Sequence, residues 1–416
     1  MAGASSYRSA CRTAAASTSL IAAWLLAACV GGSGGTSGTS GSSSSPPTPN
    51  VVTVTVDGGP ATAPGQINHA YVSVEVCMPG SSSGCATIDH VRLDTGSSGL
   101  RLVRSVLEAN KLSLTPEVDT AGNDLEECVS FAGGQTWGPV ALADVHLAGE
   151  VASKVPIQIM DDTGSGAPPP ATCGANGTLV NGVNGFGANG VLGVGVLLED
   201  CGSSCTNVAY YGCTAAGTCS AESVASGSQV GNPVARFATD NNGVLVVLPN
   251  LANANGDASV QGELIVGIAT QSDNQLPASG LSMLGADARG EFLTTYNGMQ
   301  MPGLIDSGID SYTFTDAGIA VCSSGAFVGY YCPTAAPQAA SAVNTGIGTY
   351  NGSSTIDFAI ANPSSFVATA AAFIDLAGGA GSSRFIWGMP FFYGRSVYFA
   401  LEQHTAGGFS GPFYAY

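Results

Sequence analysis

The same short pattern occurs twice in this chain, and it constrains the possible folds more than any other feature. The stretch "LDTGSSG" contains Asp94 and the stretch "IDSGIDS" contains Asp306, and each lies between two apolar runs. An acidic turn enclosed by apolar strands is held inside a core, which makes it more than a simple turn. A third match, "DDTGSG" at Asp161, continues into "APPPATCGANG", which cannot form a strand, so we expect its aspartates, Asp161 and Asp162, in an exposed loop.

An apolar pair before a glycine follows each of the two turns. Val191–Gly193 comes after Asp94, and Ile386–Gly388 comes after Asp306. The two halves of the chain therefore share one order of elements: an apolar strand, an Asp-Thr/Ser-Gly turn, and a later apolar segment that ends in glycine. This order indicates a coarse internal duplication with unequal spacing.

Composition and periodicity favour an all-β chain. Glycine is abundant at 58 of 416 residues, only 10% of the residues are charged, and 45% are hydrophobic, which is enough for a large core. Short β-branched runs bounded by turn residues, such as "VVTVTV" and "AYVSVEV", are typical of strands. Asn297 and Gly298 predict a two-residue hairpin turn. Helical patterns are confined to residues 104–111 and 364–373.

Charge and motif content exclude several classes of partner. The formal net charge is −18 and only 11 residues are Lys or Arg, so we expect neither nucleic acid nor an anionic membrane surface as a partner. The glycine-rich "GFGANG" lacks the preceding strand that a dinucleotide site needs. The histidines have no metal-ligand spacing; they are His69, His90, His146 and His404. We therefore expect no metal and no cofactor.

The N-terminus has the pattern of an export signal. Arg8 and Arg12 precede an apolar run that is too short for a transmembrane helix and ends in "LAAC". This ending resembles a bacterial lipobox, which implies a signal peptide at residues 1–28, lipidation of Cys29, and a flexible tether at residues 29–50. The chain would be an exported lipoprotein of the outer membrane, cell surface or periplasm, held at the membrane by its lipid alone. An ordinary cleaved signal with a coincidental cysteine is the alternative.

The cysteine spacing agrees with an oxidising compartment, because an even set remains beyond the signal and the lipobox. Close neighbours suggest local disulfides: Cys77 with Cys85, Cys201 with Cys205, Cys213 with Cys219, and Cys322 with Cys332. Cys128 and Cys173 remain for a longer bridge, although a sequence does not fix connectivity. A zinc site is the less favoured alternative for the four cysteines between residues 201 and 219.

The duplicated pattern resembles the pepsin-like and retropepsin-like aspartic peptidases over nearly all of the chain beyond the tether. The C-terminal residues 388–416 further resemble an uncharacterised group of proteobacterial lipoproteins related to these peptidases. The resemblance implies a bilobal pepsin-like fold, with two duplicated β-lobes at residues 51–240 and 241–416 and a cleft between them. It implies a peptide or protein substrate, and we expect a monomer.

The resemblance also implies the residues of the site. Each lobe would contribute one catalytic aspartate, Asp94 or Asp306. The residues that match the family's supporting positions in the two turns are Thr95, Gly96, Ser97, Ser307 and Gly308. In the family the threonine and serine after each aspartate lock the two turns together, and a further hydroxyl hydrogen-bonds the first carboxylate from outside. The hairpin "CVSFAGGQTWGPVAL" falls where the flap should cover the cleft.

The chemistry of such a pair follows from the proximity of its charges. Two carboxyl groups about 3 Å apart cannot both ionise readily, so they share a proton. One carboxylate can then activate water while the protonated partner donates to the peptide carbonyl. This predicts peptide hydrolysis that favours acidic pH.

Several departures from the family's pattern bear on catalysis and specificity. Ile309 stands where the second turn usually offers Ser, Thr or Ala, so no hydroxyl supports the second carboxylate from outside. Asp310 matches a retropepsin residue that binds substrate backbone. Phe131 is the nearest equivalent of the missing flap tyrosine, with Trp137 further along, and Arg101 stands where pepsins often carry tryptophan. By this resemblance we expect Phe131, Trp137 and Arg101 at the flap or facing substrate.

Three functions remain open at this point. The first is a lipid-anchored aspartic endopeptidase, the second is a non-catalytic peptide- or protein-binding surface lipoprotein with the same fold, and the third is a structural surface lipoprotein. Carboxyl groups close enough to share a proton would favour the first. A cleft filled by Arg101 or by the flap would favour the third.

Overall fold

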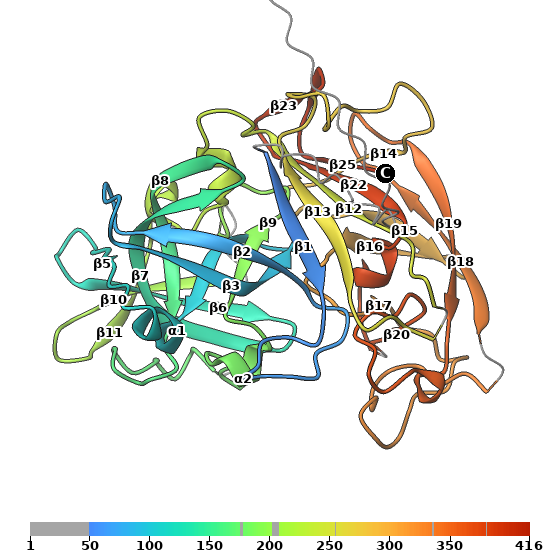
Figure 1. The fold of residues 1–416 in the computed structure, drawn as a ribbon, viewed down its shortest axis with the longest axis horizontal. Coiled ribbons are helices and arrows are strands. Elements are labelled where there is room, and N and C mark those ends of the chain that lie inside the picture. The colour runs from blue at the N-terminus through green and yellow to red at the C-terminus, as the bar shows by residue number, and fades with distance from the viewer. Residues whose placement is uncertain (1–49, 175–177, 202–207, 254, 335–336, 380) are drawn as a thin grey trace, which may run out of the picture. The chain divides into compact units, whose positions relative to one another are not determined.

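The computed structural model shows a chain that consists mostly of β-strands, as the composition predicts (Figure 1). The structure describes residues 50–174, 178–201, 208–253, 255–334, 337–379 and 381–416. The expected signal peptide, the expected lipidation site Cys29 and nearly all of the expected tether lie outside these ranges. Among the described residues, no helix is long and apolar enough to cross a membrane.

The strands of the N-terminal half belong to one large sheet. They are β1 (Val51–Val56), β2 (Ala70–Cys77), β3 (Cys85–Asp94), β4 (Ser98–Val103), β5 (Thr115–Pro116), β6 (Asp124–Phe131), β7 (Gly134–Leu147), β8 (Glu150–Met160), β9 (Gly190–Val194), β10 (Val208–Cys213) and β11 (Cys219–Glu222). The helical elements are α1 (Arg104–Ala109), α2 (Val183–Phe186), and the 3-10 turns η1 (Ser226–Ser228) and η2 (Pro233–Arg236). The prediction of a helix over residues 104–111 is thus confirmed by α1.

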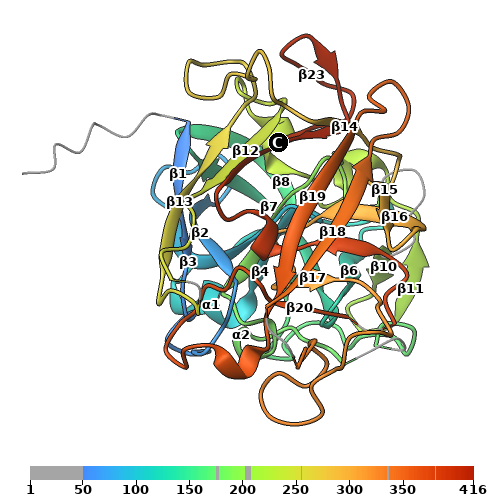
Figure 2. The ribbon, with the colours of Figure 1, turned by 90° about the vertical axis from the view of Figure 1, so that its right-hand side faces the viewer.

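The C-terminal half extends the large sheet and adds a second one. The strands that join the large sheet are β12 (Gly243–Leu248), β13 (Val260–Val266), β14 (Met283–Gly285), β22 (Arg395–Ala400) and β25 (Phe413–Ala415). The second sheet, which faces the viewer in Figure 2, contains β15 (Phe292–Tyr296), β16 (Met299–Ile305), β17 (Tyr312–Thr313), β18 (Gln338–Thr345), β19 (Ser353–Ile360), β20 (Ala377–Gly378) and β21 (Phe385–Trp387). The remaining elements are β23 (Thr405–Ala406), β24 (Phe409–Ser410), η3 (Pro363–Ser365) and η4 (Met389–Phe391).

The large sheet crosses the boundary expected at residue 240. Strand β1 pairs with β13 along its whole length, from Val51 opposite Ile265 to Val56 opposite Val260, and the two strands lie side by side in Figure 1. The main hydrophobic core is also shared, since it contains Leu93 from one half and buried side chains of β16 and β21 from the other. The division into two lobes at this boundary therefore remains a prediction.

The predicted hairpin turn is confirmed between β15 and β16. Tyr296 pairs with Met299 across the turn, and both Asn297 (φ +50°) and Gly298 (φ +76°) have positive φ. Two consecutive positive φ values match the right-handed twist of the flanking strands, which is why Asn-Gly is favoured there.

The predicted helix over residues 364–373 is wrong. Only η3 forms, where the Asn362 side chain accepts a hydrogen bond from the Ser364 N–H. Further along, the rings of Phe366 and Phe373 stack with their centroids 4.2 Å apart. Residues seven positions apart in an α-helix are separated by about 10 Å along its axis, so this stacking requires the chain to double back instead.

Four of the expected disulfides form in the described residues. They are Cys77–Cys85, Cys128–Cys173, Cys213–Cys219 and Cys322–Cys332. The long bridge confirms the pairing left for Cys128, and the bonded sulfurs rule out a zinc site built on Cys213 and Cys219. The fifth expected pair includes Cys205, which lies outside the described residues.

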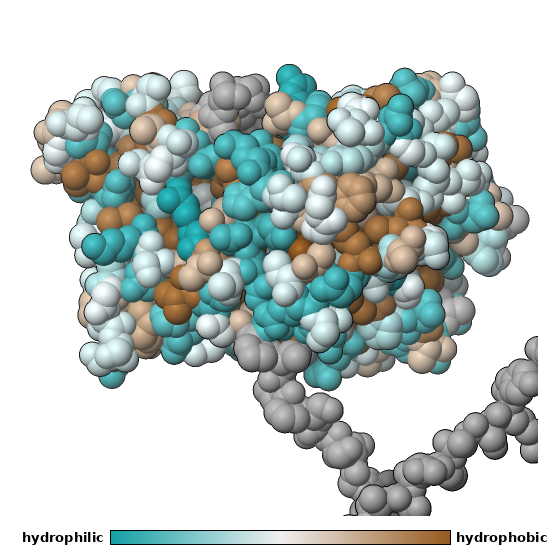
Figure 3. Space-filling model, turned by 90° about the horizontal axis from the view of Figure 1, so that it is seen from above, coloured by the Kyte–Doolittle hydropathy of each residue, from teal (hydrophilic) through white to brown (hydrophobic). Residues whose placement is uncertain are grey.

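The large apolar side chains that are exposed in the described part come from separate strands and loops. Met299, Val328 and Val118 have the highest exposed fractions among them. On the face drawn in Figure 3, hydrophobic residues lie in separate groups among hydrophilic ones. The concave surface described below is therefore the stronger candidate for binding.

Candidate active site

The first Asp turn is supported by a strand from much later in the sequence. Strand β3 ends at Asp94 and β4 begins four residues on, while β9 lies between them. Leu192 of β9 pairs in parallel with Leu93 and antiparallel with Leu100. The apolar segment Val191–Gly193 thus runs beside the turn, as the duplicated pattern predicts.

The second Asp turn repeats this arrangement. Strand β16 leads into Asp306, β17 follows the turn, and β21 lies between them. Ile386 of β21 pairs in parallel with Leu304 and antiparallel with Thr313. Both halves therefore hold their aspartate with the same three-strand topology, which supports the internal duplication inferred from the sequence.

Two buried hydroxyl residues join the turns reciprocally. The Thr95 N–H donates to Ser307 Oγ (3.1 Å), and the Ser307 N–H donates to Thr95 Oγ1 (2.9 Å). Each hydroxyl in turn donates to a carbonyl of the opposite strand, Thr95 to Ile305 (3.3 Å) and Ser307 to Leu93 (2.8 Å). Because every donor in this set has a partner across the contact, the two turns are fixed relative to each other.

The geometry brings Asp94 and Asp306 together. A Cβ atom built on Gly96 would lie 2.3 Å from the Asp306 Cγ, and one built on Gly308 would lie 2.7 Å from the Asp94 Cγ. Each carboxylate therefore packs against the glycine of the other turn, where no side chain fits. The N–H of Gly96 donates to Asp94 Oδ1 and that of Gly308 donates to Asp306 Oδ1, both at 2.8 Å.

The environment of Asp306 favours its protonated form. Burial, then the charge of Asp94 and a hydrogen bond with Asp94, raise the pKa of Asp306 well above its ordinary value. The Gly308 N–H and the guanidinium of Arg92 oppose this rise. A carboxylic acid beside a second carboxylate is the arrangement that lets one group act as an acid and the other as a base.

The supports of the two carboxyl groups differ. Ser97 Oγ donates to Asp94 Oδ2 at 2.7 Å, whereas Ile309 offers no hydroxyl at the second turn. Instead, Arg92 donates from Nη2 to the carbonyl oxygen of Gly308 at 2.6 Å. Arg92 was not predicted as a site residue. A basic residue within the apolar "VRLD" could have indicated it, because the chain has only 11 Lys and Arg residues.

A cavity of about 1410 Å³ opens over the aspartate pair. Its wall includes both carboxyl groups and the tip of the β6–β7 hairpin, where the flap is expected. Phe131 at this tip contacts Phe186 of α2 edge-to-face, with the ring centroids 5.5 Å apart. Phe131 and Phe186 both line the cavity.

Trp137 lies elsewhere, which corrects the expectation that it faces substrate. Its side chain is buried, packs edge-to-face against Tyr211 and donates from Nε1 to the Ala167 carbonyl (2.7 Å). It belongs to an apolar cluster around the disulfide of Cys128 and Cys173, and it is not among the residues that line the cavity. Its role is to pack the base of the hairpin.

Arg101 supports the hairpin from below. Its side chain is fully buried and pairs with Glu127 (3.0 Å) and Asp200 (2.5 Å), while its guanidinium lies 5.6 Å from the centroid of Phe131. Burial and then Glu127 raise the pKa of Asp200 well above its ordinary value. Arg101 thus forms part of the cavity wall and does not fill the cavity. A cavity filled by Arg101 would have favoured a purely structural protein.

Asp310 also reaches the cavity, as the retropepsin resemblance implies. Its carboxylate accepts a hydrogen bond from the Tyr330 hydroxyl, and both residues line the wall. Its main-chain carbonyl accepts from Asn68 Nδ2 at 2.7 Å. Its role toward substrate backbone remains a prediction.

The third motif, which we expected in an exposed loop, is exposed only in part. Asp162 is exposed, but Asp161 is buried, which corrects the expectation for that residue. The Asp161 carboxylate accepts hydrogen bonds from Arg104 Nε and from the N–H groups of Gly164 and Gly166, and these contacts account for its burial.

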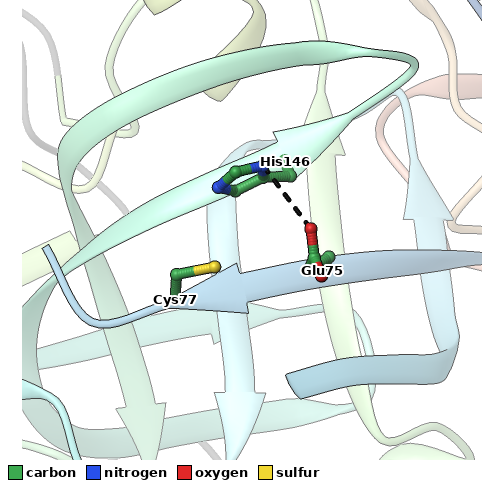
Figure 4. Close-up of side chains that lie close together, drawn as sticks. All are labelled: Glu75, Cys77 and His146. Carbon is green, nitrogen blue, oxygen red and sulfur yellow. Dashed lines mark ion pairs between the residues drawn. The ribbon is translucent and has the colours of Figure 1, made fainter. Parts of the chain in front are cut away.

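One further group of possible metal ligands lies on β2 and β7 (Figure 4). Glu75 and His146 approach to 3.5 Å beside Cys77. The Cys77 sulfur is bonded to Cys85 and is therefore no thiolate ligand. The two remaining groups are partly exposed and form an ion pair when the histidine is protonated, which is too small a ligand set to argue for a metal site.

Comparison with known proteins gives a family but no activity. The family model described as "Protein of unknown function (DUF3443)" matches residues 46–416. No curated protein sequence matches the chain. The function must therefore be inferred from the site itself.

Proposed function

We propose that this chain, which belongs to the DUF3443 family, is an aspartic endopeptidase with a pepsin-like bilobal fold. The observation that carries the proposal is the reciprocal hydrogen bonding of Thr95 and Ser307, which faces Asp94 and Asp306 toward each other at a large cavity. A structural lipoprotein has no need of two nearly buried carboxyl groups in such contact, because burying them costs free energy.

The roles of the two aspartates follow from their surroundings. Asp94 accepts hydrogen bonds from the Gly96 N–H and the Ser97 hydroxyl, which suit its ionised form, so it acts as the base toward water. Asp306 carries the shared proton and donates it to the substrate carbonyl as the tetrahedral intermediate forms. As the C–N bond breaks, the proton taken from water by Asp94 passes to the leaving nitrogen, and a hydroxyl of the tetrahedral intermediate returns a proton to Asp306.

The substrate would be a peptide in an extended conformation. The hairpin tip around Phe131 lines one side of the cavity and the C-terminal half lines the other, so a chain between them meets both. We further propose an exported protein, because the disulfides need an oxidising compartment. The proposed lipid anchor at Cys29 rests on the "LAAC" pattern of the sequence.

Digestion of a peptide library from about pH 3 to about pH 8, with wild type and Asp306→Asn, tests this proposal. Cleavage should be strongest on the acidic side and should fall as pH rises through the raised pKa of Asp306, because the acid is then lost. A statine-type inhibitor, which mimics the tetrahedral intermediate, should block it. If wild type leaves every peptide intact yet binds some of them, and Asp306→Asn binds equally well, the chain is instead a peptide-binding protein.

A further inference from the structure

Arg92 occupies an unusual position for a basic residue. It lies on β3 two positions before Asp94, and alternate residues of a strand point to the same face, so it shares the face of the first aspartate. Its side chain is half-buried and lines the cavity. Arg92 Nη2 donates to the Gly308 carbonyl at 2.6 Å, while Nε is buried with no partner among the described residues.

This hydrogen bond joins the two halves of the site. Arg92 and Gly308 are 216 positions apart, and Gly308 belongs to the turn that holds Asp306. The Gly308 N–H is the donor to the Asp306 carboxyl group, so fixing this glycine also fixes the donor. The second turn has no outer hydroxyl because Ile309 occupies that position, and the cavity side of the turn would otherwise lack a side-chain support.

We propose that Arg92 is a positioning residue that holds the second Asp turn in place of the outer hydroxyl that Ile309 lacks. The inference rests on the proposed function, which it deepens by naming the group that completes the weaker half of the pair. A charge-assisted hydrogen bond is about twice as strong as a neutral one, so a single guanidinium contact is a sufficient substitute.

The charge of Arg92 also acts on the ionisation of the pair. The titratable groups whose pKa Arg92 affects are Asp306, His69, Tyr71 and Tyr330. Asp94, Asp310, Arg289 and Arg384 line the same cavity. Burial and then Arg92 lower the pKa of His69 well below its ordinary value, so His69 adds no positive charge at neutral pH. Arg92 is therefore the main cation beside Asp306 within the described residues, and its removal should raise the pKa of Asp306.

The test compares Arg92→Met and Arg92→Lys with wild type in steady-state peptide cleavage. Arg92→Met should lower kcat on the order of 10- to 100-fold with KM within about twofold, since the charged hydrogen bond that holds the turn of Asp306 is lost. The upper limb of its pH–rate profile should move to higher pH. Arg92→Lys keeps the charge and should retain the wild-type limb with an intermediate kcat.

Arg104→Met is the matched control. Arg104 also donates to an oxygen, Asp161 Oδ1 at 3.0 Å, but it does not line the cavity, so this variant should keep the wild-type kcat and pH profile. Thermal unfolding of each variant shows whether it is folded. The inference is overturned if Arg92→Met matches wild type in both kcat and pH profile. If Arg92→Met does not fold, the same result for Arg92→Lys overturns it.

A titration separates this inference from the proposed function. Carboxyl signals of carbon-13-labelled aspartate, assigned with Asp306→Asn, report the ionisation of the pair without turnover. If wild type cleaves nothing but the Asp306 signal titrates at higher pH in Arg92→Met, the endopeptidase proposal fails and the role of Arg92 stands. An unchanged titration in a folded variant would contradict the role of Arg92 whatever the activity.

Discussion

At the scale of single residues, Thr95 and Ser307 connect the two Asp turns through hydrogen bonds that are almost fully buried. Thr95→Val keeps the shape but leaves the Ser307 N–H without an acceptor, and Ser307→Ala leaves the Thr95 N–H in the same state. Each substitution should cost about 1–3 kcal/mol of unfolding free energy. The double variant should cost less than the sum of the two, because both act on one network. Urea denaturation measures these values, and strictly additive losses would contradict the network.

Arg101 offers a second test at this scale, because it pairs with two buried carboxyl groups. Arg101→Met leaves Glu127 and Asp200 without their cation and should lower the unfolding free energy by about 3–5 kcal/mol. The triple variant Arg101→Met/Glu127→Gln/Asp200→Asn removes the buried charges together and should recover much of that loss in urea denaturation. A triple variant no more stable than Arg101→Met would show that packing, not charge, sets the cost.

These residues also mark what a sequence can predict about a site. The aspartates, their glycines and the hydroxyls of the two turns lie in short local motifs, and the resemblance of these motifs to those of aspartic peptidases predicted that the two turns meet. The contact of Arg92 with Gly308 was not, because it joins residues 216 positions apart and depends on how the two turns meet. Trp137 was misplaced for a related reason: its partners Tyr211 and Ala167 come from distant segments.

At the scale of elements, the β6–β7 hairpin buries carboxyl side chains of β6. Glu126 of β6 is buried, and its Oε2 has no hydrogen-bond partner in the described part of the chain. Burial raises the pKa of Glu126 from 4.5 to about 8, the nearby carboxylates adding to the rise and Arg104 opposing it. Because the folded-state pKa is raised, the contribution of Glu126 to the unfolding free energy is fully present below about pH 4.5 and is lost as the pH rises through about 8.

Glu126→Gln should therefore stabilise the protein at neutral pH. The gain in unfolding free energy over wild type should be about 3 kcal/mol larger at pH 7 than at pH 4. At pH 7 the wild-type side chain is ionised in the unfolded chain but must take up a proton to fold. Glu108→Gln, on an exposed position of α1, is the control and should show no such pH dependence. Urea denaturation at both pH values measures the difference, and a gain that is equal at pH 4 and pH 7 would argue against an uncharged Glu126.

Elements defined by local pattern were predicted best. The Asn297-Gly298 hairpin and α1 depend on neighbouring residues, and both form as expected. The helix over residues 364–373 did not form, because the stacking of Phe366 on Phe373 is a tertiary contact that overrides alanine's helical preference.

At the scale of the whole molecule, disulfides differ in the length of chain that they close. Cys128–Cys173 spans 45 positions and Cys213–Cys219 spans 6, and both lie beside the base of the hairpin. Loop-closure entropy predicts that replacing the first pair with alanines costs about 4 kcal/mol and the second about 2 kcal/mol. Equal losses in urea denaturation would show that local packing, not loop length, sets their contribution.

The duplication was predictable from sequence at this scale, but the joining of its halves was not. Pairing of β1 with β13 connects residues more than two hundred positions apart, and strand partners at such separation leave no periodic signal. The all-β class follows from composition, whereas the way one sheet crosses residue 240 required the structure.

The central claim is that Asp94 and Asp306 share one proton and together hydrolyse peptide bonds. The most direct test is the kcat for an unfolded protein substrate at acidic pH with Asp94→Asn, Asp306→Asn and the matched control Asp162→Asn, whose carboxylate accepts hydrogen bonds from Ser105 in an exposed segment. We predict a loss of about 100- to 10,000-fold for each of the first two variants and wild-type activity for the third. Folded Asp94→Asn or Asp306→Asn protein that still cleaves at the wild-type rate would contradict the account.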